Sequence, residues 1–499
     1  MRYLFTIFSI IIICLCSCQN ESTNQSPDLE LFAQGIASGD PGKNQVLIWT
    51  RVSLQDTTQV AELNWEMALD ADFTQTVKQG KTQAIPSNYH TTKVLVDGLE
   101  PGSYYFYRFE YNGSFSPTGR TKTLPEQADT VRLAIVNCSK YEGGYFNGFD
   151  AVANMEVIDA VLHLGDYIYE NPSVYPSSYE RAYKATGRRH KPEHEILSLS
   201  DYRTRFQQYR EDSMLQKLHQ RYPMINIWDD HETANDSWAG GAQGHQEDKE
   251  GKWETRKANA LKAYFEWIPI NKTADEPIYR SFDFADLVNV MMLDTRLCCR
   301  TEQASNPMEL DSLFTSSSIV GKEQLDWIYK TSQTSIALWN LLGNQVLMSR
   351  RYAGPDSNYI SYDQWTGYPK DRLDLLAYIA EHPEENFLIA TGNVHSAYHF
   401  LLKDGANEKT GKLITQEFAP GSISSTNSDE KNSPEEVDAE AADLRAQNPH
   451  MPWFDITNHG FIIMEFTKNT AKADWYQVST LYDTNYELIK AYSVEVLRN

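Results

Sequence analysis

The chain has 499 residues and a mass of 57.1 kDa, which exceeds one ordinary domain of about 100–200 residues, so two domains are expected. Hydrophobic residues make up 41% of the chain and charged residues 23%, which is typical of soluble globular proteins. The formal net charge of −23 disfavours a nucleic-acid-binding module, because an acidic surface repels a phosphate backbone.

The first 18 residues have the pattern of an export signal. Arg2 precedes an apolar run, residues 4–13, that is too short to span a bilayer. The sequence Leu-Cys-Ser-Cys at residues 15–18 resembles a bacterial lipobox, in which Cys18 is the lipidated residue of the mature chain. We therefore predict an exported lipoprotein that meets the membrane only through its lipid anchor, with residues 19–29 as a flexible tether. Secretion without a lipid is the alternative.

Residues 30–125 are predicted to form an all-β sandwich. Several runs in this region alternate apolar and polar side chains and are separated by turn residues, as half-buried strands are. Leu99, Pro101 and Tyr105 have the spacing of a tyrosine corner, a feature of immunoglobulin-like and fibronectin-like sandwiches. A structural role for this domain is favoured over glycan or protein binding.

Residues 126–499 alternate strand-like and helical patterns, which predicts a layered α/β domain. Within it, residues 425–447 are acidic and almost free of large apolar side chains. We expect this segment to be an exposed insertion.

Four apolar runs in the second domain end in residues that can bind metals. Such runs, rich in Val, Ile and Leu, are typical of buried parallel strands, whose carboxyl ends gather ligands at one edge of a sheet. The runs are VRLAIVNCSK (131–140), VLHLGDYIYE (161–170), MINIWDDHE (224–232) and FLIATGNVH (387–395). We therefore expect a metal site, and a hydrolase, built from Cys138, Asp166, Tyr169, Asp229, Asp230, His231, Asn393 and His395.

Residue types in these runs suggest individual roles. Asp166 and Tyr169 are three residues apart, so one turn of chain can direct both toward the same ion. A carboxylate can bridge two cations, and a phenolate suits a hard ferric ion. His231 follows Asp230 directly and offers an imidazole that can protonate a leaving oxygen. Tyrosine is common in this chain, so the Asp-Tyr pair indicates a metal only together with the other strand ends.

Cleavage of the export signal would leave Cys18, Cys138, Cys298 and Cys299. With Cys18 lipidated, the other three cannot all form disulfides. Adjacent cysteines are geometrically poor partners for each other, so the role of Cys298 and Cys299 stays open.

Several longer motifs then occur in a characteristic order. They are HLGDYIYE, WDDHETANDSWAGGA, YRSFDFADLVNVMMLDTR, LGNQVLM, TGNVHS, SISS and NPHMPWF. In these motifs the chain, from about residue 30 to its end, resembles the PhoD-type alkaline phosphatase family of the calcineurin-like metallophosphoesterases. The resemblance implies a β-sandwich over residues 30–125, followed by an α/β/β/α metallophosphoesterase domain over residues 126–499.

The same resemblance implies the roles of the site residues. A ferric ion would be held by Cys138, Asp166, Tyr169 and His395. Asp166 would bridge to a calcium ion completed by Asp230 and Asn393, and zinc or manganese are the alternative metals. His231 would assist the leaving group, and Arg296 would contact the phosphate. Two features depart from the family pattern: an amide at Asn393, where a carboxylate is usual, and an apolar sequence after Arg296.

The expected function is a metal-dependent phosphoric ester hydrolase, an alkaline phosphatase or phosphodiesterase, that attacks small phosphoesters with a metal-bound hydroxide. We expect it to act as a monomer. No GxSxG or Walker A motif occurs, which disfavours serine esterase and P-loop chemistry. The alternative is a surface binding lipoprotein whose phosphoesterase-like domain is inactive.

Overall fold

The structure is a computed structural model that describes residues 28–499, apart from 175–176, 274, 355–360 and 406–407. The predicted export signal and Cys18 therefore lie outside the described residues. Among the helices that are described, none has the length and apolar character needed to cross a membrane.

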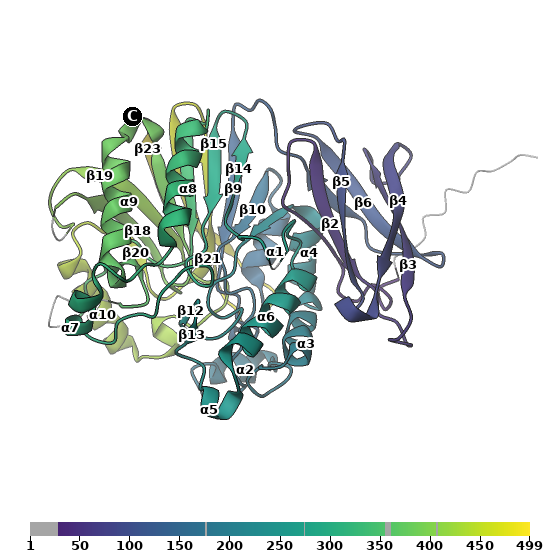
Figure 1. Cartoon of the computed structure of the whole chain (residues 1–499), viewed down its shortest axis with the longest axis horizontal. Helices are drawn as coiled ribbons and strands as arrows, with labels where there is room; N and C mark the ends of the chain where they lie inside the picture. The colour runs from purple at the N-terminus through teal and green to yellow at the C-terminus, as the bar shows by residue number, and fades with distance from the viewer. Residues whose placement is uncertain (1–27, 175–176, 274, 355–360, 406–407) are drawn as a thin grey trace, which may run out of the picture.

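Two large sheets face each other and are covered by helices on their outer sides (Figure 1). The first has nine strands, in the spatial order β23 (Leu488–Leu497), β22 (Thr470–Val478), β21 (His459–Phe466), β9 (Val131–Val136), β10 (Ala160–His163), β11 (Met224–Asn226), β1 (Ile36–Gly39), β2 (Gln45–Arg51) and β5 (Thr91–Asp97). The second has seven, in the order β14 (Arg280–Phe284), β15 (Val288–Met292), β16 (Trp339–Asn344), β17 (Phe387–Thr391), β19 (Leu413–Pro420), β18 (Ala397–Lys403) and β20 (Trp453–Asp455). The predicted α/β class is confirmed.

Helices pack on both outer faces. The nine-stranded sheet is covered by α1 (Asn147–Asn154), α3 (Leu199–Arg210), α4 (Ser213–Arg221) and α6 (Trp253–Trp267). The seven-stranded sheet is covered by α8 (Gly321–Thr334) and α9 (Pro369–Glu381). The remaining α-helices are α2 (Glu180–Thr186), α5 (Glu247–Glu250), α7 (Pro307–Leu313) and α10 (Pro434–Gln447). Short 3-10 helices occur at Pro86–Asn88, Tyr141–Gly143, Trp365–Gly367, Pro383–Glu385 and Ser428–Glu430.

The N-terminal β-sandwich is present, and one of its layers belongs to the main sheet. Its outer layer contains β4 (Thr76–Ala84), β3 (Ala61–Ala68), β6 (Tyr104–Tyr111), β7 (Ser114–Phe115) and β8 (Gly119–Lys122). The inner layer is β1, β2 and β5, and β1 pairs in parallel with β11 through Gly39 and Met224. The predicted tyrosine corner is confirmed, because the backbone N–H of Glu100 donates to the Tyr105 hydroxyl at 2.8 Å.

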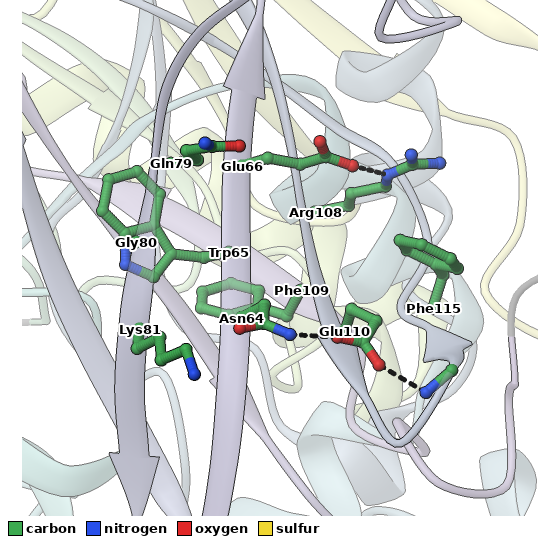
Figure 2. A pocket seen from close by; sticks show the side chains of 11 residues that line it. Asn64, Trp65, Glu66, Gln79, Gly80, Lys81, Arg108, Phe109, Glu110 and Phe115 are labelled. Carbon is green, nitrogen blue, oxygen red and sulfur yellow. Dashed lines mark hydrogen bonds and ion pairs between the residues drawn. The ribbon is translucent and has the colours of Figure 1, made fainter.

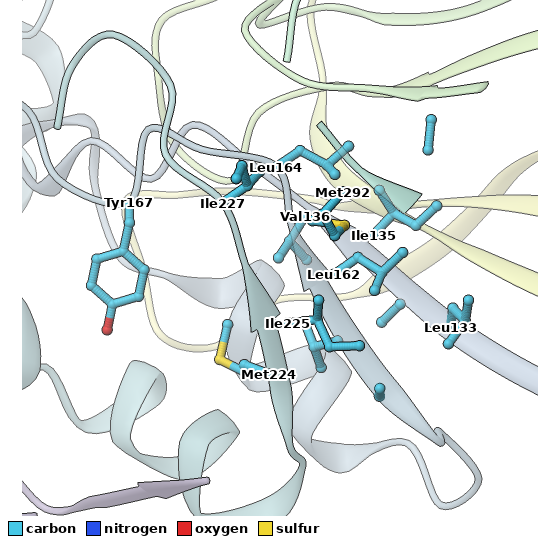
Figure 3. Packing of buried hydrophobic residues seen from close by; sticks show 14 of the residues in the cluster. Leu133, Ile135, Val136, Leu162, Leu164, Tyr167, Met224, Ile225, Ile227 and Met292 are labelled. Atoms are coloured by element: carbon cyan, nitrogen blue, oxygen red, sulfur yellow. The ribbon is translucent and has the colours of Figure 1, made fainter. Parts of the chain in front are cut away.

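The strands that carry the predicted ligands are buried and parallel, as expected. β9, β10 and β11 are parallel neighbours, and β17 lies parallel to β16 and β19. Figure 3 shows Leu133, Leu162 and Ile225 of the first three strands packed beside Met292 of β15. The ligands therefore come from two facing sheets, with β9 to β11 in one and β17 in the other. A short hairpin, β12 (Ser237–Trp238) and β13 (Gly241–Ala242), follows β11.

The prediction that residues 425–447 form an exposed insertion is wrong for its first part. Residues 425–428 are buried, and the Ser425 hydroxyl donates to the Tyr169 hydroxyl at 2.6 Å. The rest of the segment forms α10, which is anchored by the fully buried Leu444. The acidic composition thus reflects the solvent-facing side of α10. Ser425, before the helix, is polar but buried, because its hydroxyl bonds to the buried Tyr169.

Gly165 allows the loops after β10 and β11 to meet. It has φ +101°, and a Cβ atom added there would lie 2.4 Å from the Asp229 Cβ and 2.6 Å from the Asp229 nitrogen. We expect Gly165→Ala to lower the free energy of unfolding by about 3 kcal/mol or more, through strain and a clash with backbone. Urea denaturation measures the loss.

Gly187→Ala is the matched control for that experiment. Gly187 also has a positive φ, +68°, but nothing lies within 4 Å of its added Cβ. Strain alone should then cost about 1–2 kcal/mol. Equal losses in the two variants would show that the contact with Asp229 has no energetic weight.

Candidate metal centre

The structure brings the predicted ligands together in two groups. The first contains Cys138, Asp166 and His395, and the second contains Asp166, Asp230 and His231. Within each group the ligand atoms lie within 4.8 Å of one another. Because Asp166 belongs to both groups, its carboxylate is placed to bridge two ions.

Tyr169 joins the first group through hydrogen bonds. Its hydroxyl donates to Oδ2 of Asp166 at 2.8 Å, and the Cys138 thiol contacts the same oxygen at 3.3 Å. Nδ1 of His395 lies 2.8 Å from the carbonyl oxygen of Thr426, which can only accept a hydrogen bond, so Nδ1 is the donor. This bond fixes the imidazole tautomer and leaves Nε2 of His395 as the nitrogen that can bind a metal.

These groups are strongly perturbed in the protein without a cation. Burial, reinforced by the Asp166 carboxylate, raises the pKa of the Cys138 thiol and of the Tyr169 phenol well above their ordinary values. Burial also raises the pKa of Asp166 to about 7. Oδ1 of Asp166 and Oδ2 of Asp229 are buried without a hydrogen-bond partner. Bound cations would satisfy these oxygens and favour the anionic ligands, so the residues fit a metal centre.

In the second group, charges of both signs are close together. Burial opposes ionisation of Asp230, but Arg296 and His231 outweigh it and lower its pKa to about 2. For His231, burial opposes protonation, but the carboxylates of Glu170, Asp166 and Asp230 outweigh it and raise its pKa well above the ordinary value. Nδ1 of His231 lies 2.6 Å from Oε2 of Glu170. Glu170 therefore orients this histidine, and the surrounding carboxylates favour its protonated form.

Two glutamates that the sequence analysis left without a role hold this region in place. Glu170 orients His231, as described above. Glu232 accepts hydrogen bonds from the backbone nitrogens of Asp166 at 3.1 Å, Tyr167 at 2.7 Å and Asp229 at 2.9 Å. Glu232 thus ties together the loops after β10 and β11. A sequence signal could have identified both glutamates: each is an acidic residue at the end of an apolar run that is typical of a buried strand.

Arg296 is fully buried and surrounded by carboxylates. Its Nε lies 2.5 Å from Asp229, and its Nη2 lies 3.5 Å from Asp230. The same guanidinium pairs with Asp363, to which Arg300 also donates at 2.6 Å. Asp363 was not identified from the sequence, because no strand pattern precedes it. Arg296 therefore braces two acidic site residues, and its donors already have partners.

Asn393 lies next to this network, and its backbone is unusual. Its side-chain amide donates to Oδ2 of Asp363 at 3.1 Å. Asn393, Cys138 and Asp166 have φ values of 58°, 54° and 57°, in the left-handed region that few residues other than glycine adopt. Three of the predicted ligands share this strain, which is characteristic of functional sites.

A pocket of about 760 Å³ lies in the N-terminal sandwich, among Trp65, Phe109 and polar residues (Figure 2). Four of its polar side chains pair with one another across the strands. The Glu66 carboxylate lies 2.5 Å from Nε of Arg108, and Asn64 donates to Glu110. None of its lining residues belongs to the two ligand groups, so this pocket is separate from the metal centre.

Comparison with known proteins supports the family resemblance that the sequence motifs indicate. The family model "PhoD-like phosphatase" matches residues 133–475, and "PhoD-like phosphatase, N-terminal domain" matches residues 17–125. Alkaline phosphatase D of Bacillus subtilis (strain 168) is 33% identical over 465 residues, which cover 89% of this chain and 77% of that protein. The solved structure of PhoD superimposes with a TM-score of 0.85 at 29% identity, over 95% of this chain and 92% of the other. The chain therefore belongs to the PhoD-like phosphatase family, and it is a phosphoric ester hydrolase.

Proposed function

We propose that the chain hydrolyses small phosphomonoesters or phosphodiesters with two metal ions. Ferric iron would be held by Cys138, Asp166, Tyr169 and His395. Calcium would be held by Asp166, Asp230 and Asn393. The observation that carries the proposal is the carboxylate of Asp166, which belongs to both ligand groups and has one oxygen without a hydrogen-bond partner.

The donor atoms support these two metals. Thiolate, phenolate and imidazole together suit iron, whereas carboxylate and amide oxygens suit calcium. Zinc and manganese are the alternatives, since both accept imidazole or carboxylate ligands. The complete ligand set argues against a binding lipoprotein with an inactive phosphoesterase-like domain.

When bound, the metal ions would supply a hydroxide nucleophile and neutralise the phosphate oxygens. His231 would donate its proton to the leaving oxygen, because Glu170 binds Nδ1 and leaves Nε2 for the substrate. The His231 side chain is 12% exposed, while that of Glu170 is 1% exposed, so only the imidazole is accessible to a ligand. We assign Arg296 a positioning role instead of a phosphate contact, because it is fully buried and paired with three carboxylates.

Tyr169→Phe tests the iron assignment. A phenolate bound to ferric iron absorbs visible light by charge transfer, so the iron-loaded protein should be coloured and the variant should lose the band. Tyr167→Phe is the control, because the Tyr167 hydroxyl bonds to His219 at 2.8 Å instead of to the ligand groups. An active, iron-loaded wild type without colour would contradict the proposal, as would full activity with zinc or manganese alone.

His231→Ala tests the proton donor. General acid catalysis contributes about 10²–10⁴-fold in rate, and mostly for basic leaving groups. We expect kcat/KM to fall by about that factor for alkyl phosphates and by less than about tenfold for activated aryl phosphates. His194→Ala, at a residue whose side chain is 67% exposed, is the control. An equal loss for both substrate classes would remove His231 from the acid role.

We also propose that the mature chain is exported, lipidated at Cys18 and monomeric, with residues 19–29 as its tether. The lipobox-like sequence at residues 15–18 supports this proposal. Cys18→Ser should move the protein from the membrane fraction to the soluble fraction, as measured by fractionation and immunoblotting. A variant that stays with the membrane would exclude the lipid anchor as the means of attachment.

A further inference from the structure

A second, polar pocket borders the candidate metal centre. Its volume is about 260 Å³, and Asn393 and His395 are among the residues that line it. A later segment contributes Thr426, Asn427, Ser428, Lys431 and Asn432 to the lining. Pockets for drug-sized ligands have volumes of about 300–1,000 Å³, so this one fits only a small group.

Two cationic side chains line this pocket, the half-buried Arg351 and the exposed Lys431. Glu430 and Glu440 interact electrostatically with Lys431, and Glu440 also lines the pocket. The lining thus carries two cations and one carboxylate, so its net charge is positive. A net positive charge around one small polar space favours a small anion.

The two carboxylates near Lys431 also have hydrogen-bond donors of their own. Glu440 also lines the pocket, and its Oε2 accepts a hydrogen bond from the Ser428 hydroxyl at 2.5 Å. Glu430, which precedes Lys431, lies 3.4 Å from His459 and accepts a hydrogen bond from the Tyr482 hydroxyl at 2.7 Å. These two carboxylates therefore offset the charge of Lys431 only in part, and Arg351 adds a second positive charge to the lining.

The pocket is attached firmly to the metal centre. The segment that leads to Lys431 holds two of the candidate ligands, because Ser425 donates to Tyr169 and the Thr426 carbonyl fixes His395. Within the same segment, Asn427 accepts a hydrogen bond from the Ser396 hydroxyl at 2.9 Å. The backbone that carries Lys431 is thus held in a fixed position relative to these two candidate ligands.

We propose that this pocket binds a second anionic group on the alcohol part of the substrate. The preferred substrates are small phosphoesters whose leaving group carries its own carboxylate or phosphate, a few bonds from the scissile ester. This inference rests on the proposed function, because it places the reacting phosphate at the metal centre. It adds Arg351 and Lys431 as the residues that select the leaving group.

A matched pair of esters tests the proposal. Glycerol 3-phosphate and 3-phosphoglycerate have the same carbon skeleton, but only the second has a carboxylate in its leaving group. With the metal-loaded full-length protein, we expect kcat/KM to favour 3-phosphoglycerate by about tenfold, as one charge-assisted contact allows. Added salt should reduce that preference, because Lys431 is exposed.

Substitutions then assign the preference to the two cations. Lys431→Gln and Arg351→Gln should each raise KM for 3-phosphoglycerate several-fold and leave glycerol 3-phosphate within about twofold. Lys468→Gln is the matched control, because it removes the same charge from an exposed turn between β21 and β22. An equal effect on both esters, or an unchanged preference in the double variant, would overturn the proposal.

Product binding separates this inference from the proposed function. Titration calorimetry of the metal-loaded protein with glycerate and with glycerol measures the affinity of the pocket for each product without turnover. Selective binding of glycerate, lost in Lys431→Gln, would support the pocket even if neither ester were cleaved, and only the hydrolytic mechanism would then fail. Cleavage of both esters with equal efficiency, together with no binding of glycerate, would refute anion binding at the pocket and leave the proposed hydrolysis unaffected.

Discussion

The structure depends on the electrostatic repulsion among several carboxylates that are buried at one point. Asp166, Asp229, Asp230 and Glu232 all come from the loops after β10 and β11, and each is at most 2% exposed. Arg296 compensates two of them, and three backbone N–H groups compensate Glu232. Oxygens of Asp166 and Asp229 still lack hydrogen-bond partners, so the protein alone leaves buried carboxylate oxygens unsatisfied. A bound cation would satisfy them, which is why these residues fit a metal centre.

Strained backbone at the site follows from the same convergence. Ligands from β9, β10 and β17 reach a common point only because the chain turns sharply within two or three residues of each strand end. Cys138, Asp166 and Asn393 therefore adopt left-handed conformations, which cost of order 1–3 kcal/mol each. The fully buried parallel strands can offset that cost, because their hydrophobic packing and hydrogen bonds do not depend on the loops.

The sequence predicts the strand ends well, because an uninterrupted apolar run followed by polar residues has few structural alternatives. It could not show that the ligands come from two sheets, since β17 has the same pattern as β10. Contacts between distant segments could not be predicted either. Tyr169 and Ser425 are 256 residues apart in the sequence, and Arg296 and Asp363 are 67 residues apart. Neither Ser425 nor Asp363 follows a recognisable strand. The family resemblance implied a phosphate contact for Arg296, and its burial could not be foreseen because it depends on the distant Asp363.

The shared sheet has a consequence for any attempt to shorten the protein. β1 lies against β11, and the contact is reinforced where the Trp49 indole donates to the carbonyl of Glu266 at 2.8 Å and Arg280 pairs with Asp40 at 2.7 Å. A chain that began at residue 126 would expose one side of β11 as an unpaired edge, and such edges recruit strands from other molecules. We therefore expect the N-terminal layer to shield the catalytic sheet from self-association, and a fragment that lacks it to associate through β11.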